Sequence, residues 1–71
     1  MPLMTKTLKI NGLNYLFNSG MTIKSLIDYL GFNKNVIVID YNGYILSKNL
    51  WDETGLCNGD TLEILSIAGG G

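Results

Sequence analysis

The first eighteen residues alternate between apolar and polar positions in a way that predicts a β-hairpin. Residues 4–10 and Leu13–Asn18 have the composition of two strands. The Asn11-Gly12 pair between them is typical of a type I′ turn, because that turn needs positive φ at both central residues. The chain is therefore expected to begin with two antiparallel strands.

The next apolar residues follow a different spacing. From Ile23 they recur at positions i, i+3, i+4 and i+7, which is one apolar stripe of an α-helix over residues 22–30. Thr22 is expected to cap the N-terminus through its hydroxyl, and Gly31 to end the helix in the left-handed conformation. This is the only helix that the pattern predicts, and its apolar face must pack on a sheet.

The second half of the chain predicts three more strands. Residues 36–40 read VIVID, a β-branched run that indicates a strand covered by protein on both faces or nearly so. Asn42-Gly43 then predicts a second hairpin turn before Tyr44–Leu46. An irregular segment follows, with one helical turn expected near residues 50–54. The last strand is expected over residues 61–67.

One helix among five short strands indicates an α+β fold. We expect the helix to pack on one face of a mixed sheet of four to five strands. In this arrangement the first and last strands lie side by side, residues 36–40 pair on one flank, and the first hairpin lies on the other. That is the β-grasp, or ubiquitin-like, layout. We assign residues 1–67 to the domain and 68–71 to a flexible glycine tail.

Composition narrows the function. The 71 residues allow one domain, and five lysines against six acidic residues give a net charge of -1 without any arginine or histidine. No basic run suggests nucleic-acid binding, and no segment approaches the ~20 apolar residues of a membrane span. We therefore expect a monomer that binds neither nucleic acid nor membranes and that remains in the compartment where it is made.

The side chains offer little chemistry. The acidic candidates are not spaced as a catalytic dyad; they are Asp40, Asp52, Glu53, Asp60 and Glu63. We interpret Asp60, which follows Asn-Gly, as a turn residue. The single Cys57 has no basic neighbour that would lower its pKa, so we expect an inert thiol. Trp51 is expected to be partly buried with an exposed edge. We predict no catalytic residue and no metal ligand.

The chain ends on LSIAGGG, and this end is the strongest candidate for function. Glycine has no Cβ, so an extended glycine segment can enter a crevice that a larger residue would block. The four residues 68–71 span at most ~13–14 Å when extended. That reach would place the terminal carboxylate inside another protein's active site. There ATP could activate it as an acyl-adenylate, which accepts sulfide or an amine.

Taken together in order, several segments resemble the ThiS family, the small sulfur carriers of thiamin biosynthesis. They are INGLNYLF, TIKSLIDYLG, VIVIDYNGYIL, LW, NGDTLEIL and the closing AGGG. The resemblance implies that the Gly71 carboxylate is adenylated and converted to a thiocarboxylate, while Gly70 and Gly69 form the thin thread that enters partner active sites. This chain lacks the proline that often precedes the basic residue of the Trp segment, here Lys48, and its tail has the additional Gly69.

The resemblance also implies the partners. They are an E1-like adenylating enzyme of the ThiF type, a sulfur-donating enzyme, and thiazole synthase of the ThiG type, which receives the sulfur. ATP is used by the adenylating partner, and no cofactor is expected on this chain. The compartment is expected to be the cytoplasm, or the plastid stroma if the gene is organellar. The chain is rich in Asn, Ile and Tyr, amino acids with A+T-rich codons, which indicates an A+T-rich bacterial or organellar genome.

Three alternatives use the same end differently. The small subunit of molybdopterin synthase has the same tail chemistry, but prolines typically precede its final Gly-Gly, and this chain has none there. A ubiquitin-like modifier would be conjugated to lysine, and an interaction domain would leave the tail unmodified. For partner docking the sequence offers Leu65 and Ile67, which could lie opposite the helix or belong to the core.

Overall fold

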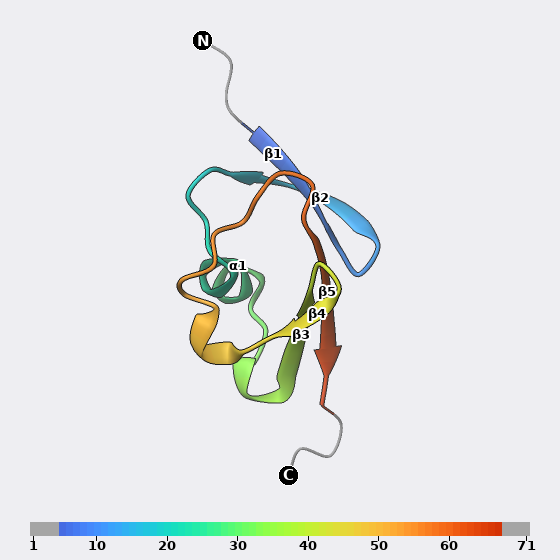
Figure 1. Ribbon diagram of the computed structural model, residues 1–71, viewed down its shortest axis with the longest axis vertical. Coiled ribbons are helices and arrows are strands. Elements are labelled where there is room, and N and C mark those ends of the chain that lie inside the picture. Colours follow the sequence, from blue (N-terminus) through green and yellow to red (C-terminus); the bar gives the residue numbers. More distant parts are fainter. Residues whose placement is uncertain (1–4, 68–71) are drawn as a thin grey trace.

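The computed structural model describes residues 5–67. In that part of the chain it contains five strands, one α-helix and two short 3-10 helices (Figure 1). In chain order they are β1 (Thr5–Ile10), β2 (Leu13–Asn18), α1 (Ile23–Leu30), η1 (Lys34–Val36), β3 (Ile37–Tyr41), β4 (Tyr44–Leu46), η2 (Lys48–Leu50) and β5 (Thr61–Ser66).

The five strands form one mixed sheet in the order β2-β1-β5-β3-β4. The central pair β1 and β5 is parallel, and the other neighbouring pairs are antiparallel. Helix α1 packs against one face of the sheet (Figure 1). The predicted α+β class, the β-grasp layout and the adjacency of the first and last strands are all confirmed.

Both predicted hairpin turns are present. Asn11 and Gly12 have φ values of 51° and 84°, and Asn42 and Gly43 have 52° and 100°. These are the left-handed conformations that a type I′ turn requires, and asparagine and glycine adopt them at least cost. The turns fix the register of β1 on β2 and of β3 on β4.

The helix has the predicted ends. The Thr22 hydroxyl accepts from the backbone N–H of Ser25 at 3.2 Å, and the Ser25 hydroxyl accepts from the Thr22 N–H at 2.8 Å. This reciprocal pair is a capping box, with serine in place of the usual Glu or Gln. Gly31 ends the helix at φ 81°, in the left-handed region. The cap sets where α1 begins, and the apolar residues Ile23, Leu26 and Ile27 of the helix are buried.

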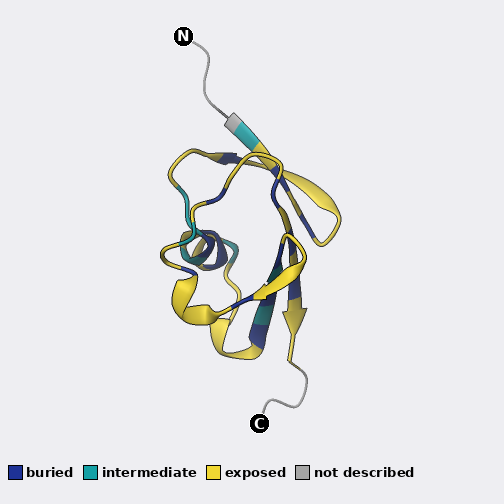
Figure 2. Cartoon of the chain, viewed as in Figure 1, coloured by how far each residue is buried: buried dark blue, intermediate teal, exposed yellow. Residues whose placement is uncertain are grey.

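The core lies between α1 and the inner face of the sheet, where Figure 2 shows the buried residues. Every strand contributes to it, and the loop after η2 adds two residues. The core consists of Leu8, Ile10, Phe17, Ile23, Leu26, Ile27, Ile37, Ile39, Tyr41, Leu46, Trp51, Leu56, Leu62 and Ile64. Because there is one helix, the outer face of the sheet is left without a covering layer in the described residues.

Strand β3 differs from its prediction. Val36 belongs to η1, and the strand runs from Ile37 to Tyr41. Its burial alternates, with Ile37, Ile39 and Tyr41 buried while Val38 and Asp40 are half-buried. The apolar run suggested a strand covered on both faces, and that prediction was too strong. A helix covers one face only, so the other face of this β-branched strand is partly exposed to solvent.

The irregular segment also differs from its prediction. The helical turn is η2 at Lys48–Leu50, slightly earlier than expected, and β5 ends at Ser66. Trp51 is only 2% exposed, so the expected exposed edge is wrong. Its indole N–H donates to the Leu46 carbonyl at 3.2 Å, which satisfies the polar atom inside the core. The Trp51 carbonyl accepts from the Lys24 N–H at 3.1 Å, joining this loop to α1.

Candidate functional site

The C-terminal segment departs from the end of β5, and this departure point is firmly held. Ser66 lies opposite Ile37 in the β3–β5 ladder. The next residue, Ile67, donates its N–H to the Val36 carbonyl at 2.7 Å. The predicted tail, residues 68–71 with Gly69, Gly70 and Gly71, lies outside the described residues. The structure therefore fixes the point from which that segment starts.

The side chain of Asn11 supports β5 beyond the point where the pairing of β5 with β1 ends. Strand β1 pairs with β5 only through Lys9 and Ile10. Beyond that point the Asn11 amide takes over, because its Oδ1 accepts from the Ile64 N–H at 2.7 Å and its Nδ2 donates to the Ile64 carbonyl at 3.4 Å. Asn11 thus acts as one more residue of β1 and holds the last part of β5 in extended conformation.

The two predicted docking residues lie on the outer side of this strand end. Leu65 is 46% exposed and Ile67 is 44% exposed, whereas Leu62 and Ile64 are buried. The alternative that Leu65 and Ile67 belong to the core does not match the structure. Their role in docking stays a prediction, but they are in a position to meet a partner that receives the adjoining tail.

Neighbouring apolar residues enlarge this surface. Val38 lies directly opposite Leu65, and Val36 is bonded through its carbonyl to Ile67. We call these four residues, Val36, Val38, Leu65 and Ile67, the tail-base patch. Ile45 on β4 is also exposed and lies opposite Asp40, the next outer-face residue of β3. Sequence reasoning missed the two valines, although the period of two that places 65 and 67 outside also applies to Val38 on β3; Val36 belongs to η1, where that period does not hold.

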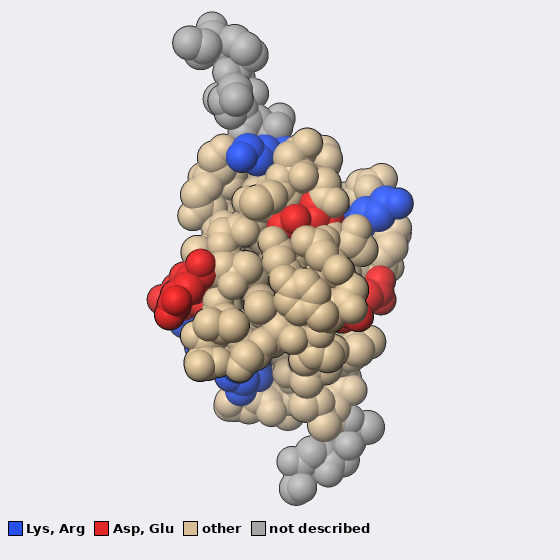
Figure 3. All heavy atoms as spheres, viewed as in Figure 1, with Lys and Arg blue, Asp and Glu red and all other residues tan. Residues whose placement is uncertain are grey.

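Charges border the patch and do not interrupt it. Asp40 and Glu63 lie opposite each other on β3 and β5, two pairs of residues beyond Val38 and Leu65 along the ladder. On the face drawn in Figure 3, charged side chains form small separate groups with a wide uncharged area between them. Contiguous exposed apolar surface with a polar border is typical of protein interaction sites.

Asp60 has a larger structural role than a turn residue. It is 7% exposed, and its carboxylate accepts from the Tyr41 hydroxyl at 2.8 Å, the Asn42 amide at 3.1 Å and the Cys57 N–H at 2.7 Å. Burial, the hydrogen bond and the nearby negative charge raise the pKa of Tyr41 well above its ordinary value. This cluster ties the loop before β5 to the β3–β4 turn, so its chemistry is structural.

The described residues offer no assembled reactive centre. The Cys57 thiol is exposed, and its Sγ is 4.0 Å from the Gly55 carbonyl oxygen. Across residues 5–67, no three metal-binding side chains come together. In the same range, no helix has the length and apolar character needed to cross a membrane. An exposed apolar surface lies beside the point where the C-terminal segment starts.

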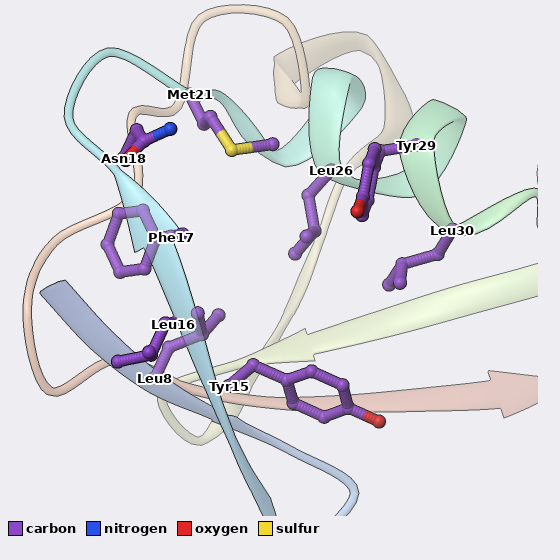
Figure 4. Close-up of a pocket in the computed structure, with 9 residues that line it drawn as sticks. All are labelled: Leu8, Tyr15, Leu16, Phe17, Asn18, Met21, Leu26, Tyr29 and Leu30. Atoms are coloured by element: carbon purple, nitrogen blue, oxygen red, sulfur yellow. The ribbon is translucent and has the colours of Figure 1, made fainter. Parts of the chain in front are cut away.

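A second apolar surface lies at the opposite edge of the sheet. A groove of about 340 Å³ runs between β2 and α1 (Figure 4). Leu26, Tyr29 and Leu30 of the helix face Tyr15 and Leu16 of the strand across it. Strand β2 is separated from β5 by β1, so this groove is not part of the site at the tail base.

The sheet order, the single helix and the apolar surface at the base of a glycine-ending segment define a small β-grasp protein. The ThiS family model matches residues 5–71 of the chain. The chain is 36% identical over 66 residues to a protein named ycf40 of Trieres chinensis, which covers 93% of this chain and 90% of that protein. This chain belongs to the ThiS family.

Two further relatives differ in the share of their own length that this chain covers. A crystal structure of the thiamine biosynthesis protein ThiS from Geobacter metallireducens matches with a TM-score of 0.75 and 26% identity, covering 92% of this chain and 99% of that one. The chain is also 33% identical over 64 residues to thiazole synthase of Paramagnetospirillum magneticum, covering 90% of this chain but 20% of that protein. A ThiS-like segment therefore forms a minor part of that longer chain.

Proposed function

We propose that this chain is a sulfur carrier of thiamin biosynthesis that acts as a protein cosubstrate and has no active site of its own. The observation that carries the proposal is the tail-base patch. In a ThiS-family chain, an exposed apolar surface lies where the glycine-ending segment leaves a rigid strand. A partner can hold the folded body by this patch while the thin segment enters its active site.

The proposed chemistry takes place at the terminal carboxylate of Gly71. An E1-like enzyme of the ThiF type joins that carboxylate to the AMP part of ATP and releases pyrophosphate. Sulfide (HS⁻) delivered by a donor enzyme then attacks the acyl carbon, and AMP leaves. The product is a thiocarboxylate, in which sulfur has replaced one oxygen. Gly70 and Gly69 keep the segment narrow enough to reach the reaction centre.

Thiazole synthase is the proposed acceptor of the sulfur. The match to a segment of the thiazole synthase of Paramagnetospirillum magneticum supports this assignment, since there a ThiS-like sequence and a protein of that name share one polypeptide. The relatives named ycf40, a name given to plastid reading frames, support the plastid stroma as the compartment in place of a bacterial cytoplasm. The carrier is proposed to work as a monomer.

Intact-mass measurement tests the proposal. The protein is incubated with ATP, an adenylating enzyme and a sulfur source, beside a control from which Gly71 has been deleted. We expect a gain equal to the exchange of one oxygen for sulfur in the full chain and none in the control. Addition of thiazole synthase should reverse the gain. An amide link between Gly71 and a lysine would instead identify a ubiquitin-like modifier. Loss of the sulfur only to the large subunit of molybdopterin synthase would identify a carrier of molybdopterin synthesis. A chain that gains no modification would contradict the proposal.

A further inference from the structure

Three of the five lysines of the chain gather around one hollow on the helix side of the molecule. This hollow has a volume of about 300 Å³, and it is lined by Lys24, Lys34, Lys48, Asn49, Trp51 and Asp52. We call it the lysine hollow. Trp51, one of the lining residues, is almost fully buried. The lysine stems can therefore cover apolar surface while their ammonium groups remain in water.

The lysine hollow lies close to the base of the C-terminal segment. Lys34 is the first residue of η1 and Val36 is the last. The Val36 carbonyl accepts the hydrogen bond from the Ile67 N–H. The Lys48 ammonium is 3.5 Å from the Asn35 side-chain oxygen, in the middle of η1. Two of the three lysines are thus attached to the short element that anchors the end of β5. A partner that receives the C-terminal segment would meet them at its active-site entrance.

The charge of the hollow differs in sign from that of the rest of the chain. Three lysines against Asp28 and Asp52 leave the hollow with a net charge of about +1. The rest of the chain has two lysines and four acidic residues, so its net charge is about -2. The hollow is therefore net positive, while the remaining side chains are together net negative.

The existing ion pairs leave these lysines available. Asp28 is 3.0 Å from the Lys24 ammonium and 3.9 Å from that of Lys34, and all three side chains are about half exposed. The hydrogen bond and the charge of Asp28 raise the pKa of Lys24. The Lys24 hydrogen bond lowers the pKa of Asp28. Exposed pairs of this kind contribute little to stability, so a better acidic partner can replace them. Among the described residues, Lys48 has no carboxylate within ion-pair distance.

We propose that the lysine hollow docks an acidic surface segment at the active-site entrance of the adenylating enzyme. The inference rests on the proposed function, because that enzyme is the first to receive the Gly71 carboxylate. The tail-base patch and the lysine hollow lie on opposite faces of the sheet and are joined by η1, so the enzyme would contact both around this end of the molecule. The apolar part holds the complex, and the charged part speeds and orients its formation.

The association rate constant with a ThiF-type adenylating enzyme tests the inference at low and at physiological salt. The variant Lys34→Glu/Lys48→Glu should associate about tenfold more slowly at low salt, and added salt should reduce the difference. The matched control Lys6→Glu/Lys9→Glu changes net charge equally, but Lys9 lies beside Thr61, at the other end of β5. It should associate within about twofold of the wild-type rate. Thermal unfolding of each variant verifies that it is folded.

A third variant predicts a change of opposite sign. Asp28→Asn removes the acidic competitor of Lys24 and Lys34, so association should be about twofold faster at low salt. Equal slowing by the two double variants, or no change in either, would overturn the inference while the sulfur gain on Gly71 still stood. A wild-type chain that neither binds any adenylating enzyme nor gains sulfur would overturn both proposals.

Discussion

The two faces of strand β5 are both apolar, but they meet different surroundings. Leu62 and Ile64 point into the core under α1, and they are 0% and 7% exposed. Leu65 and Ile67 lie on the side without a helix and are nearly half exposed. A fold with one helix can bury only one face of its sheet. Apolar residues on the other face lower solubility, and they contribute less to the free energy of unfolding than the buried ones do. Their place beside the C-terminal segment gives them a different use, which is recognition.

The comparison first predicts that the inner face determines stability. Leu62→Ala should lower the free energy of unfolding by about 2–5 kcal/mol, because it leaves a cavity in a fully buried site. That is a large part of the roughly 4–10 kcal/mol expected of a domain of this size. Urea unfolding followed by the fluorescence of the buried Trp51 measures the change.

Leu62→Met is the matched control for this prediction. It preserves volume and should cost less than about 1.5 kcal/mol. A loss below about 1 kcal/mol for Leu62→Ala would mean that the inner face is less tightly packed than the structure indicates.

The second prediction concerns the buried cluster behind the same strand. Tyr41→Phe removes the hydrogen bond to Asp60 and should cost about 1.5–3 kcal/mol at neutral pH, since the acceptor is charged. Asp60 keeps its bonds from Asn42 and Cys57, so the fold should survive.

The pH dependence of this variant has a definite sign. The pKa of Tyr41 is raised in the folded state above its ordinary value of 10.0. Above that pH the unfolded chain releases the proton first, so the wild-type protein loses stability as the pH rises. Phenylalanine has no such proton. Urea unfolding at pH 8 to 11 should therefore show the gap between wild type and variant closing on the alkaline side, and a gap that widens there would refute the assignment.

The third prediction separates local structure from docking. Thr22→Ala removes the hydroxyl that caps α1 and should cost about 1 kcal/mol. Serine at this position should restore most of the loss, because it can cap in the same way. Neither change touches the tail-base patch, so sulfur loading of the folded protein should proceed at the wild-type rate. Denaturant unfolding measures the loss of stability, and intact mass measures the rate of sulfur loading.

The features that the sequence predicted correctly depend on short-range signals. The Asn-Gly turns, the Thr22 cap and the Gly31 end are each decided by a few adjacent residues. With the helix spacing, these signals were sufficient for the β-grasp topology, because one apolar stripe can pack in few ways on a sheet.

The features that the sequence did not predict depend on residues far apart in the chain. Trp51 is buried in part because α1 packs beside it, with the Trp51 carbonyl accepting from the Lys24 N–H, and this contact does not follow from the residues next to Trp51. The Asp60 cluster joins positions 19 residues apart. The lysine hollow brings together three different elements, and only the fold places them beside the tail base.

The variant Leu65→Ser tests the contrast between the two faces of β5 most directly. Its control is Leu16→Ser, at an exposed position on the edge strand β2. For both, the free energy of unfolding and the kcat/KM of thiocarboxylate formation are measured. We expect both variants to retain wild-type stability within about 0.5 kcal/mol. Only Leu65→Ser should lose about tenfold or more in kcat/KM, because it removes apolar contact with the adenylating enzyme. Equal kcat/KM for the two variants, or a loss that merely follows a fall in stability, would contradict the assignment of the outer face to docking.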